Sequence, residues 1–259
     1  MNQPLRRGGE LLREIESMRA ETPVLWWLGH SGFALKFHDI IFYIDPSLGD
    51  GPERLTAPPL DPAEIGNADL VLCTHAHRRH MDPATLPAMM AASPRARLVL
   101  PKSAAAHALA IGIDYGRMTT TDSDLRVYTR IYAVPSAHAA LDYTPEGGYP
   151  YLGYLVRCGG CTIYHAGDGI AYETLAARLR PYNVTVALLP ISGGPANFDA
   201  PGAAQLAEDI GARWLATMHY ATFPGDGDVN RFIDHMLGLR PHQRFKIFQC
   251  GEGWAVPLE

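Results

Sequence analysis

The sequence predicts a layered α/β sandwich, and three observations support this prediction. The 259-residue chain is 47% hydrophobic, which supplies enough apolar side chains for a sizeable core. Its first part contains short β-branched and aromatic runs separated by turn residues, a pattern typical of strands in hairpins. From Asp69 onward, apolar strands alternate with helical stretches, and helices that pack on sheets form layers.

The predicted elements follow one another along the whole chain. A short amphipathic helix is expected near the N-terminus, with one apolar face formed by Leu11, Leu12, Ile15 and Met18. Strands are expected over residues 24–28, 33–37, 40–44, 70–74, 98–100, 127–134, 152–158, 161–165, 184–189, 214–218 and 245–249. Helices are expected over residues 83–92, 103–111, 172–179, 201–210 and 228–237. Two Pro- and Gly-rich stretches, 50–62 and 139–150, are typical of long functional loops.

We expect residues 1–259 to form one domain, with residues 1–22 as an N-terminal extension that contains the short helix. The chain has 22 Lys and Arg against 27 Asp and Glu, and its net charge of −5 offers no global attraction to nucleic acid or an anionic membrane. It has no apolar run near the ~20 residues that span a bilayer, and its start lacks a signal-peptide core. We therefore expect a soluble, cytoplasmic protein with no nucleic-acid or membrane partner; whether copies form a homo-oligomer stays open.

The four cysteines are too few and too unevenly spaced for a disulfide framework. Two of them form the string Cys158-Gly159-Gly160-Cys161, whose spacing also occurs in redox and zinc motifs. Two glycines between apolar runs favour a two-residue hairpin turn instead, which would place Cys158 opposite Cys161.

Three of the eleven histidines follow the predicted strand over residues 70–74. His75, His77 and His80 lie within six residues, and imidazoles two residues apart in an extended segment project to the same side. A turn after them can bring His80 alongside. Three imidazoles so close together have little structural use without a cation, so this cluster predicts a metal site.

Other candidate ligands also follow apolar strands. His138, Asp168 and His219 each come just after a predicted strand, at the edge where α/β scaffolds collect site residues. Imidazole and carboxylate together suit Zn²⁺ or a similar divalent ion. Alone, each of these residues is more simply explained by a surface position, a hydrogen bond or a turn. We expect four histidines to lie outside the site, and two more, His30 and His165, stay open; the four are His38, His107, His235 and His242.

The histidine string resembles the His-x-His-x-Asp-His signature of the metallo-β-lactamase fold. Within that superfamily, the sequence resembles the ascorbate-6-phosphate lactonase-like (UlaG-like) metal-dependent hydrolases. Further segments of the resemblance are Trp26-Trp27-Leu28-Gly29-His30-Ser31-Gly32-Phe33, Ile163-Tyr164-His165-Ala166-Gly167-Asp168, Ala187-Leu188-Leu189-Pro190-Ile191, Met218-His219-Tyr220-Ala221-Thr222-Phe223-Pro224 and Phe248-Gln249-Cys250-Gly251-Glu252. The resemblance implies a four-layer αββα sandwich with the metal site at the rim of the two sheets.

The resemblance also implies a ligand set for one or two divalent ions, Zn²⁺ first, with Mn²⁺ or Fe²⁺ as alternatives. It places the first ion on His75, His77 and His138, and makes Asp168 the carboxylate that bridges two ions. The second ion would lie on His80 and His219.

The sequence departs from the family pattern at position 79, where the pattern has an aspartate and this chain has Arg79. A guanidinium offers no lone pair to a metal, and its charge repels a second dication. We therefore expect one tightly held metal, with a second weak or absent. Arg79 could bind an anionic substrate group bidentately, or it could be a loop charge in solvent like Arg78. Asp82 could substitute for the aspartate, but a structural role at the start of the next helix is favoured.

These residues predict metal-dependent hydrolysis. A divalent ion lowers the pKa of its bound water toward ~7 and polarises a substrate oxygen, so a metal-bound hydroxide is the expected nucleophile. Asp168 would orient that water or accept its proton, and Asp168, His219 and Arg79 are the residues expected to act in the reaction. The expected substrate contacts are Arg79, His30, Asn197, Tyr220 and Phe223. A structural hydrogen bond for His30 and core packing for the aromatic residues are the alternatives.

The expected activity is hydrolysis of a small, anionic ester, lactone or phosphoester. Two alternatives stay open: a small phosphodiesterase on the same fold, and a metal-binding protein with reduced catalysis because of Arg79.

Overall fold

The computed structural model describes residues 1–121, 126–128 and 130–258. Its helices are α1 (Gly8–Ser17), α2 (Leu86–Ala92), α3 (Ala105–Ala110), α4 (Leu175–Leu179), α5 (Ala200–Asp209) and α6 (Val229–Leu239). Single 3₁₀ turns lie at Pro62–Glu64, Lys102–Ala104, Tyr115–Arg117 and Arg180–Tyr182. The strands are β1 (Val24–Gly29), β2 (Gly32–Phe37), β3 (Ile40–Ile44), β4 (Leu70–Leu72), β5 (Arg97–Pro101), β6 (Met118–Thr121), β7 (Arg126–Tyr128), β8 (Ile131–Pro135), β9 (Leu152–Cys158), β10 (Cys161–His165), β11 (Val186–Pro190), β12 (Trp214–Met218), β13 (Arg244–Lys246) and β14 (Gly253–Ala255).

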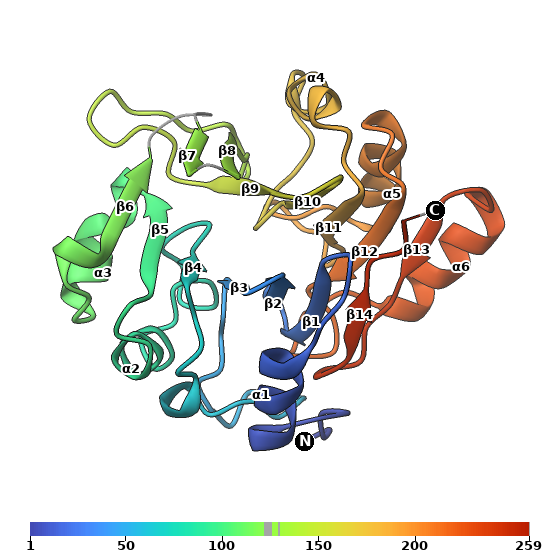
Figure 1. Cartoon of the computed structure of the whole chain (residues 1–259). Helices are drawn as coiled ribbons and strands as arrows, with labels where there is room; N and C mark the ends of the chain where they lie inside the picture. Colours follow the sequence, from blue (N-terminus) through green and yellow to red (C-terminus); the bar gives the residue numbers. More distant parts are fainter. Residues whose placement is uncertain (122–125, 129, 259) are drawn as a thin grey trace.

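Within the described residues, the strands form two seven-stranded sheets. The first has the order β14-β1-β2-β3-β4-β5-β6, and the second has the order β13-β12-β11-β10-β9-β8-β7. Helices α1 to α3 lie beside the first sheet and helices α4 to α6 beside the second, so the sheets are enclosed between two helical layers (Figure 1). The predicted four-layer αββα sandwich is confirmed.

Successive side chains along the strands of the first sheet alternate between two hydrophobic cores, which hold the layers together. In β1, Leu25 and Trp27 belong to the core between the two sheets, whereas Trp26 and Leu28 belong to the core under α1 to α3. Successive strand side chains point to opposite faces, so a strand that is covered on both faces is buried along its whole length. The expected amphipathic N-terminal helix forms as α1 and buries Leu11, Leu12 and Ile15 in the same helix-covered core.

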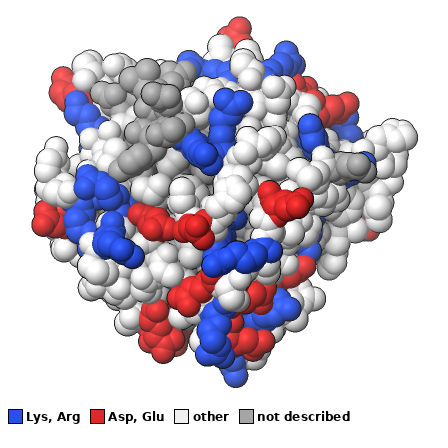
Figure 2. Space-filling model, viewed as in Figure 1, with Lys and Arg blue, Asp and Glu red and all other residues white. Residues whose placement is uncertain are grey.

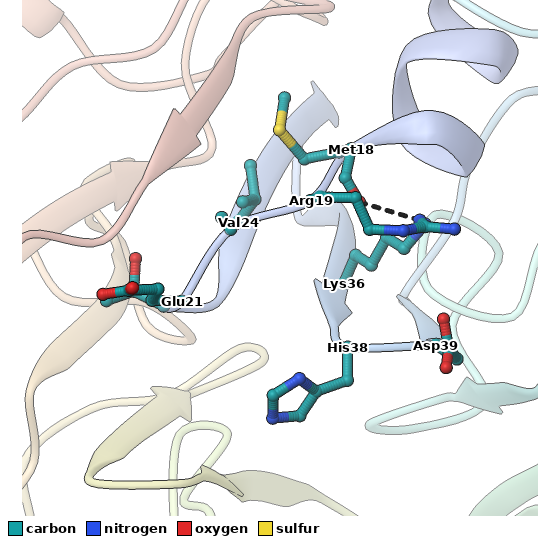
Figure 3. A pocket seen from close by; sticks show the side chains of 9 residues that line it. Met18, Arg19, Glu21, Val24, Lys36, His38 and Asp39 are labelled. Carbon is teal, nitrogen blue, oxygen red and sulfur yellow. Dashed lines mark hydrogen bonds between the residues drawn. The ribbon is translucent and has the colours of Figure 1, made fainter.

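Lys36 ties the end of α1 to the first sheet. Its Nζ donates to the carbonyl oxygens of Ile15 and Glu16, which lie in the last turn of the helix. Burial lowers the pKa of Lys36. Figure 3 shows Lys36 near Arg19 in a cavity of about 530 Å³ between the end of α1 and the β2–β3 turn. This cavity is lined by residues other than the predicted metal ligands.

Several predicted boundaries were wrong. The single strand expected over residues 127–134 is a hairpin of β7 and β8, in which Tyr128 pairs with Ile131; residue 129 lies outside the described residues. The chain reverses there without a Gly, Pro, Asn or Asp, so the sequence carried no turn signal. The last predicted strand shortens to β13, and β6 and β14 were not predicted. None of the helices in the described ranges is long and apolar enough to cross a membrane.

The Cys158–Cys161 string forms the predicted hairpin turn. Cys158 and Cys161 lie directly opposite each other where β9 meets β10, and Gly159 has the positive φ of +62° that such a turn requires. The four cysteines are free and buried. The hairpin interpretation is therefore confirmed.

Candidate metal centre

The ends of four strands deliver the predicted ligands to one place. β8, β10 and β12 run in the same direction in the second sheet, and His138, Asp168 and His219 follow their carboxyl ends. The segment with His75 and His80 follows β4 of the first sheet. The strand ends at Leu72 and the chain bends from Thr74 onward instead of staying extended as expected, yet the rings of His75 and His77 still meet, with centroids 4.6 Å apart.

The Asp168 carboxylate lies at the middle of the cluster. Its Oδ2 is 3.6 Å from His75 Nε2 and 3.5 Å from His138 Nε2. Its Oδ1 is 3.1 Å from His80 Nε2 and 3.4 Å from His219 Nε2. Each carboxylate oxygen therefore faces its own pair of imidazoles, and His77 joins the Oδ2 side. This is the arrangement of a carboxylate between two cation positions.

The donor atoms fit a small divalent ion. Two ligands that each lie 2.0–2.1 Å from a tetrahedral ion are about 3.3 Å apart, close to the spacings around Asp168. The Nε2 atoms of His75 and His219 are buried and lack a hydrogen-bond partner, which is costly for polar atoms unless something else satisfies them. A divalent ion would satisfy both, so the residues present fit the metal that the sequence predicts.

The charges of the metal-free cluster are set by burial and by two carboxylates. Burial lowers the pKa values of His75 and His219 well below the usual range, so both rings are neutral at pH 7 and can act as ligands. Burial also acts to lower the pKa of His80, but Asp168 and Asp45 outweigh it and raise that pKa to about 10. Although burial opposes it, His80 in turn holds the pKa of Asp168 well below its usual range.

Asp45 is a functional residue that the sequence analysis missed. It is completely buried just after β3, and its Oδ2 lies 2.7 Å from His80 Nδ1. The same carboxylate accepts hydrogen bonds from the backbone N–H of Thr74, at 2.8 Å, and from its hydroxyl, at 2.7 Å. A carboxylate behind an imidazole fixes which ring nitrogen carries the proton and turns the other toward a metal. Asp45 therefore positions His80.

Tyr151 was also missed. Its ring stacks on His138, with centroids 4.5 Å apart and planes 10° apart, and it contacts the edges of His75 and His77. Tyr151 lies one residue before β9, between the predicted loop over residues 139–150 and the predicted strand over residues 152–158. The stacking holds the half-buried His138 beside the cluster.

Backbone strain is concentrated at the centre. His30, Asp45 and His219 all have positive φ values, of 49°, 44° and 60°, which side chains other than glycine rarely adopt. Gly167, with φ +64°, precedes Asp168 and passes so close to Thr74 that a Cβ there would lie 2.7 Å from the Thr74 Cβ. The turns that present these side chains are therefore held in place by tertiary contacts.

The predicted substrate contacts do not all face the centre. Arg79 is half-buried, and its guanidinium carbon lies 4.1 Å above the Phe223 ring. Asn197 lies beside Asp168: its amide nitrogen faces Oδ1 at 3.3 Å, and its amide oxygen accepts from the Ser192 hydroxyl. Tyr220 lies in the core instead, stacked on Trp27 with its hydroxyl donating to the carbonyl of Phe248, as the core-packing alternative expected.

The remaining histidines fall into those that lie beside the cluster and those that lie outside it. His165 is fully buried, with Nε2 donating to the Ser31 carbonyl and Nδ1 accepting from the Gly167 N–H, so both ring nitrogens are occupied. His30 stacks on His219 and lies with His80 and His219 in a group whose ligand atoms are within 4.8 Å of one another. The metal-binding groups found among the described residues include none of the four histidines expected to lie outside, His38, His107, His235 and His242.

Two adjoining cavities open at the centre. One, of about 320 Å³, is lined by His77, His80, Asp168 and His219 together with Arg78, Arg79 and Asn197. The other, of about 550 Å³, is lined by segment 47–54, Phe223 and the same two arginines. Arg78 and Arg79 therefore line both the cavity at the histidine cluster and a second hollow large enough for part of a small molecule.

The pattern of the β-lactamase superfamily domain matches residues 24–219, which include every predicted metal ligand. The chain belongs to the β-lactamase superfamily. The family expected from the histidine string is thus confirmed, and its closer resemblance to the ascorbate-6-phosphate lactonases stays a prediction.

Curated relatives of this superfamily member are similar over most of their length. A UPF0173 metal-dependent hydrolase of Thermococcus kodakarensis is 35% identical over 205 residues, covering 76% of this chain and 84% of the relative. Another, from Caldivirga maquilingensis, is 27% identical over 243 residues, covering 91% and 99%. These relatives are named metal-dependent hydrolases, the class of enzyme that the sequence predicted.

Solved structures share the fold. Igni18, a metallo hydrolase of Ignicoccus hospitalis, superimposes with a TM-score of 0.70 at 22% identity, covering 92% of this chain and all of that one. An isothiocyanate hydrolase from Delia radicum gut bacteria superimposes with a TM-score of 0.72 at 15% identity, covering 90% and 99%. At these identities the likeness concerns the αββα fold alone.

Proposed function

We propose that this metal-dependent hydrolase acts on a small ester, lactone or phosphoester that carries a negative charge. The observation that carries the proposal is the position of Arg79 and Arg78 on the wall shared by the two cavities. A guanidinium in this position can bind a carboxylate or phosphate through two parallel hydrogen bonds. A substrate whose reactive group reaches Asp168 would thus place its anionic group between the arginines.

The phenyl ring of Phe223 prepares Arg79 for this role. A guanidinium stacked on an aromatic face is held in one plane by cation–π attraction, so less side-chain entropy is lost when an anion binds. The acidic Asp82 in the same cavity does not compete for Arg79, because its oxygens accept from the N–H groups of Gly49 and Ala84 and from the Thr85 hydroxyl. These bonds also agree with the structural role predicted for Asp82.

When bound at the centre, a divalent ion would supply a water of lowered pKa and polarise the carbonyl or phosphoryl oxygen of the substrate, which makes the attached carbon or phosphorus more electrophilic. The protein's own residues do the rest. Asp168, an anion at neutral pH, can orient that water and accept its proton. Asn197 lies against Asp168 Oδ1 and holds the carboxylate in place. The buried rings of His75 and His219 exclude bulk water from the reacting atoms.

The surface charge supports a small anion over a long polyanion. On the face drawn in Figure 2, Lys and Arg side chains are interspersed with Asp and Glu. Nucleic acid requires a continuous basic surface, whereas two arginines at the rim of a cavity suffice for one carboxylate or phosphate group.

The proposal is tested with a substrate panel and one matched pair of variants. Zinc- or manganese-loaded protein is assayed with lactones, carboxylic esters, phosphomonoesters and small phosphodiesters, each in an anionic and a neutral form. Arg79→Ala should lower kcat/KM for the anionic form by about 10- to 100-fold, because a charge-assisted pair contributes about 1.5–3 kcal/mol, and leave the neutral form unchanged. Arg95→Ala, an exposed arginine before β5, should change neither.

Four outcomes would overturn this proposal. If rates are equal on anionic and neutral substrates, or if Arg79→Ala leaves the kinetics unchanged, then Arg79 is a loop charge with no role in substrate binding. Exclusive hydrolysis of phosphodiesters would favour the phosphodiesterase alternative. Loaded protein that hydrolyses nothing in the panel would favour a metal-binding protein with reduced catalysis.

A further inference from the structure

His30 is fixed at the metal centre by its backbone. It follows β1 in a left-handed conformation and is only 5% exposed. Its N–H donates to the Thr222 hydroxyl at 2.7 Å, and its carbonyl accepts from the His219 N–H at 3.1 Å and from the Trp27 indole at 3.0 Å. Two tertiary hydrogen bonds and one local bond thus hold a strained residue in place, against the loop that carries His219.

The imidazole of His30 lies against the two rings that face Asp168 Oδ1, those of His80 and His219. It stacks on His219 with centroids 3.8 Å apart, and it meets His80 edge-on at 5.6 Å. One nitrogen from each of these three rings lies within 4.8 Å of the other two. His30 also lines the cavity that contains Asp168 and His219. The ring therefore occupies the same space as two of the predicted ligands.

A carboxylate also lies near His30 Nδ1, a buried nitrogen that makes no hydrogen bond within the described residues. Asp226 Oδ1 is 3.4 Å from His30 Nδ1, and both groups are buried. The other oxygen of Asp226 accepts from the N–H groups of Thr222 and Phe223, each at 2.9 Å, so the carboxylate cannot turn away. Metal-binding histidines characteristically direct their second nitrogen to such a carboxylate, which leaves Nε2 available to the ion.

We propose that His30 is a metal ligand, and that with His80 and His219 it completes a cation position on the Oδ1 side of Asp168. Three imidazoles and one carboxylate oxygen form a donor set that suits Zn²⁺ or a similar divalent ion. Position 79 then supplies no ligand, because Arg79 is stacked on Phe223. The inference concerns metal binding and does not depend on the substrate proposed above.

The test counts metal equivalents on metal-free protein titrated with Zn²⁺ or Co²⁺. Wild-type protein should bind two equivalents. His30→Asn, chosen because asparagine tolerates positive φ, should retain the first equivalent and bind the second at least about 100-fold more weakly. The matched control is His38→Asn, since His38 is an exposed histidine with a similar φ of 53°; it should bind like wild type. Circular dichroism and thermal melts establish that each variant is folded.

A measurement on unaltered protein keeps the inference testable if His30→Asn does not fold. Anomalous diffraction from zinc-loaded crystals should show a peak within about 2.3 Å of a His30 nitrogen and on the Oδ1 side of Asp168. The inference would be overturned if the second ion lay more than about 3 Å from His30. It would also be overturned if His30→Asn bound the second metal equivalent with wild-type affinity. A single equivalent in wild-type protein would also overturn this inference while leaving the proposed hydrolase intact; no bound metal at all would remove both.

Discussion

Replacing Asp45 by asparagine should weaken metal binding without removing any predicted ligand. One oxygen of Asp45 accepts from the Thr74 N–H, and the other accepts from the Thr74 hydroxyl and lies 2.7 Å from His80 Nδ1. An asparagine can keep the first bond, but its NH₂ group would replace the acceptor that faces His80. The amide then donates to Nδ1 and moves the His80 proton to Nε2, the nitrogen that the metal needs.

The expected magnitudes follow from these contacts. Loss of a carboxylate behind a metal-binding imidazole lowers metal affinity by about 10- to 100-fold. The metal-free protein also loses two hydrogen bonds to the completely buried carboxylate, which contribute about 1.5–3 kcal/mol each, while the bond that the amide donates to Nδ1 offsets about 1 kcal/mol. We therefore expect Asp45→Asn to lower its free energy of unfolding by about 2–5 kcal/mol. The loss of metal affinity and the loss of stability both result from changing Oδ2 of Asp45, so both should appear in the same variant.

Competition with a chromophoric chelator measures the affinity, and urea denaturation of the metal-free protein measures the stability. The control is Asp69→Asn, which alters an exposed aspartate at the opposite end of the neighbouring strand, where it accepts from the Ile41 N–H. It should leave metal affinity unchanged. A folded Asp45→Asn variant with wild-type affinity would refute the positioning role of Asp45, whatever its stability.

Two further predictions concern stability. Burial raises the pKa values of Cys158 and Cys250 to about 12, so above about pH 9 only the unfolded chain loses these protons. The free energy of unfolding should therefore fall by up to about 1.4 kcal/mol per pH unit for each thiol. Urea denaturation across this pH range should show a smaller fall in a variant with both cysteines replaced by alanine. Gly167→Ala should lower the free energy of unfolding by about 1–3 kcal/mol more than Gly194→Ala, as measured by thermal melts. Both glycines have positive φ, but a Cβ would meet a neighbouring residue, Thr74, only at Gly167. Equal losses of stability in the two variants would contradict this prediction.

The sequence predicted which residues the fold brings together in the candidate metal centre, because these residues obey a rule of sheet geometry. His138, Asp168 and His219 each follow an apolar run, and the carboxyl ends of strands that run in one direction meet at one edge. The same rule would have identified Asp45, which directly follows the strand over residues 40–44. It was missed because a lone carboxylate before a proline is typical of a turn, and its contact with His80 spans 35 positions of the chain.

Other features depend on tertiary structure that no local pattern records. Tyr220 follows the ligand His219 directly, and the sequence placed it on the pocket wall. The positive φ values of His219 and Ala221 turn the chain so that Tyr220 points into the core while Phe223 stays at the cavity. The β7–β8 hairpin was missed for a related reason, since a reversal without turn residues is stabilised by pairing partners elsewhere in the sheet.

Arg79 and His30 together change what the altered histidine string means for this enzyme. From the sequence, a cation in place of the aspartate indicated one tightly held metal and a weakened second position. In the folded protein, Arg79 stacks on Phe223, and His30 brings a third imidazole to the Oδ1 side of Asp168 from a strand far away in the chain. If His30 binds the ion, position 79 is released from metal binding and becomes free to recognise an anionic substrate.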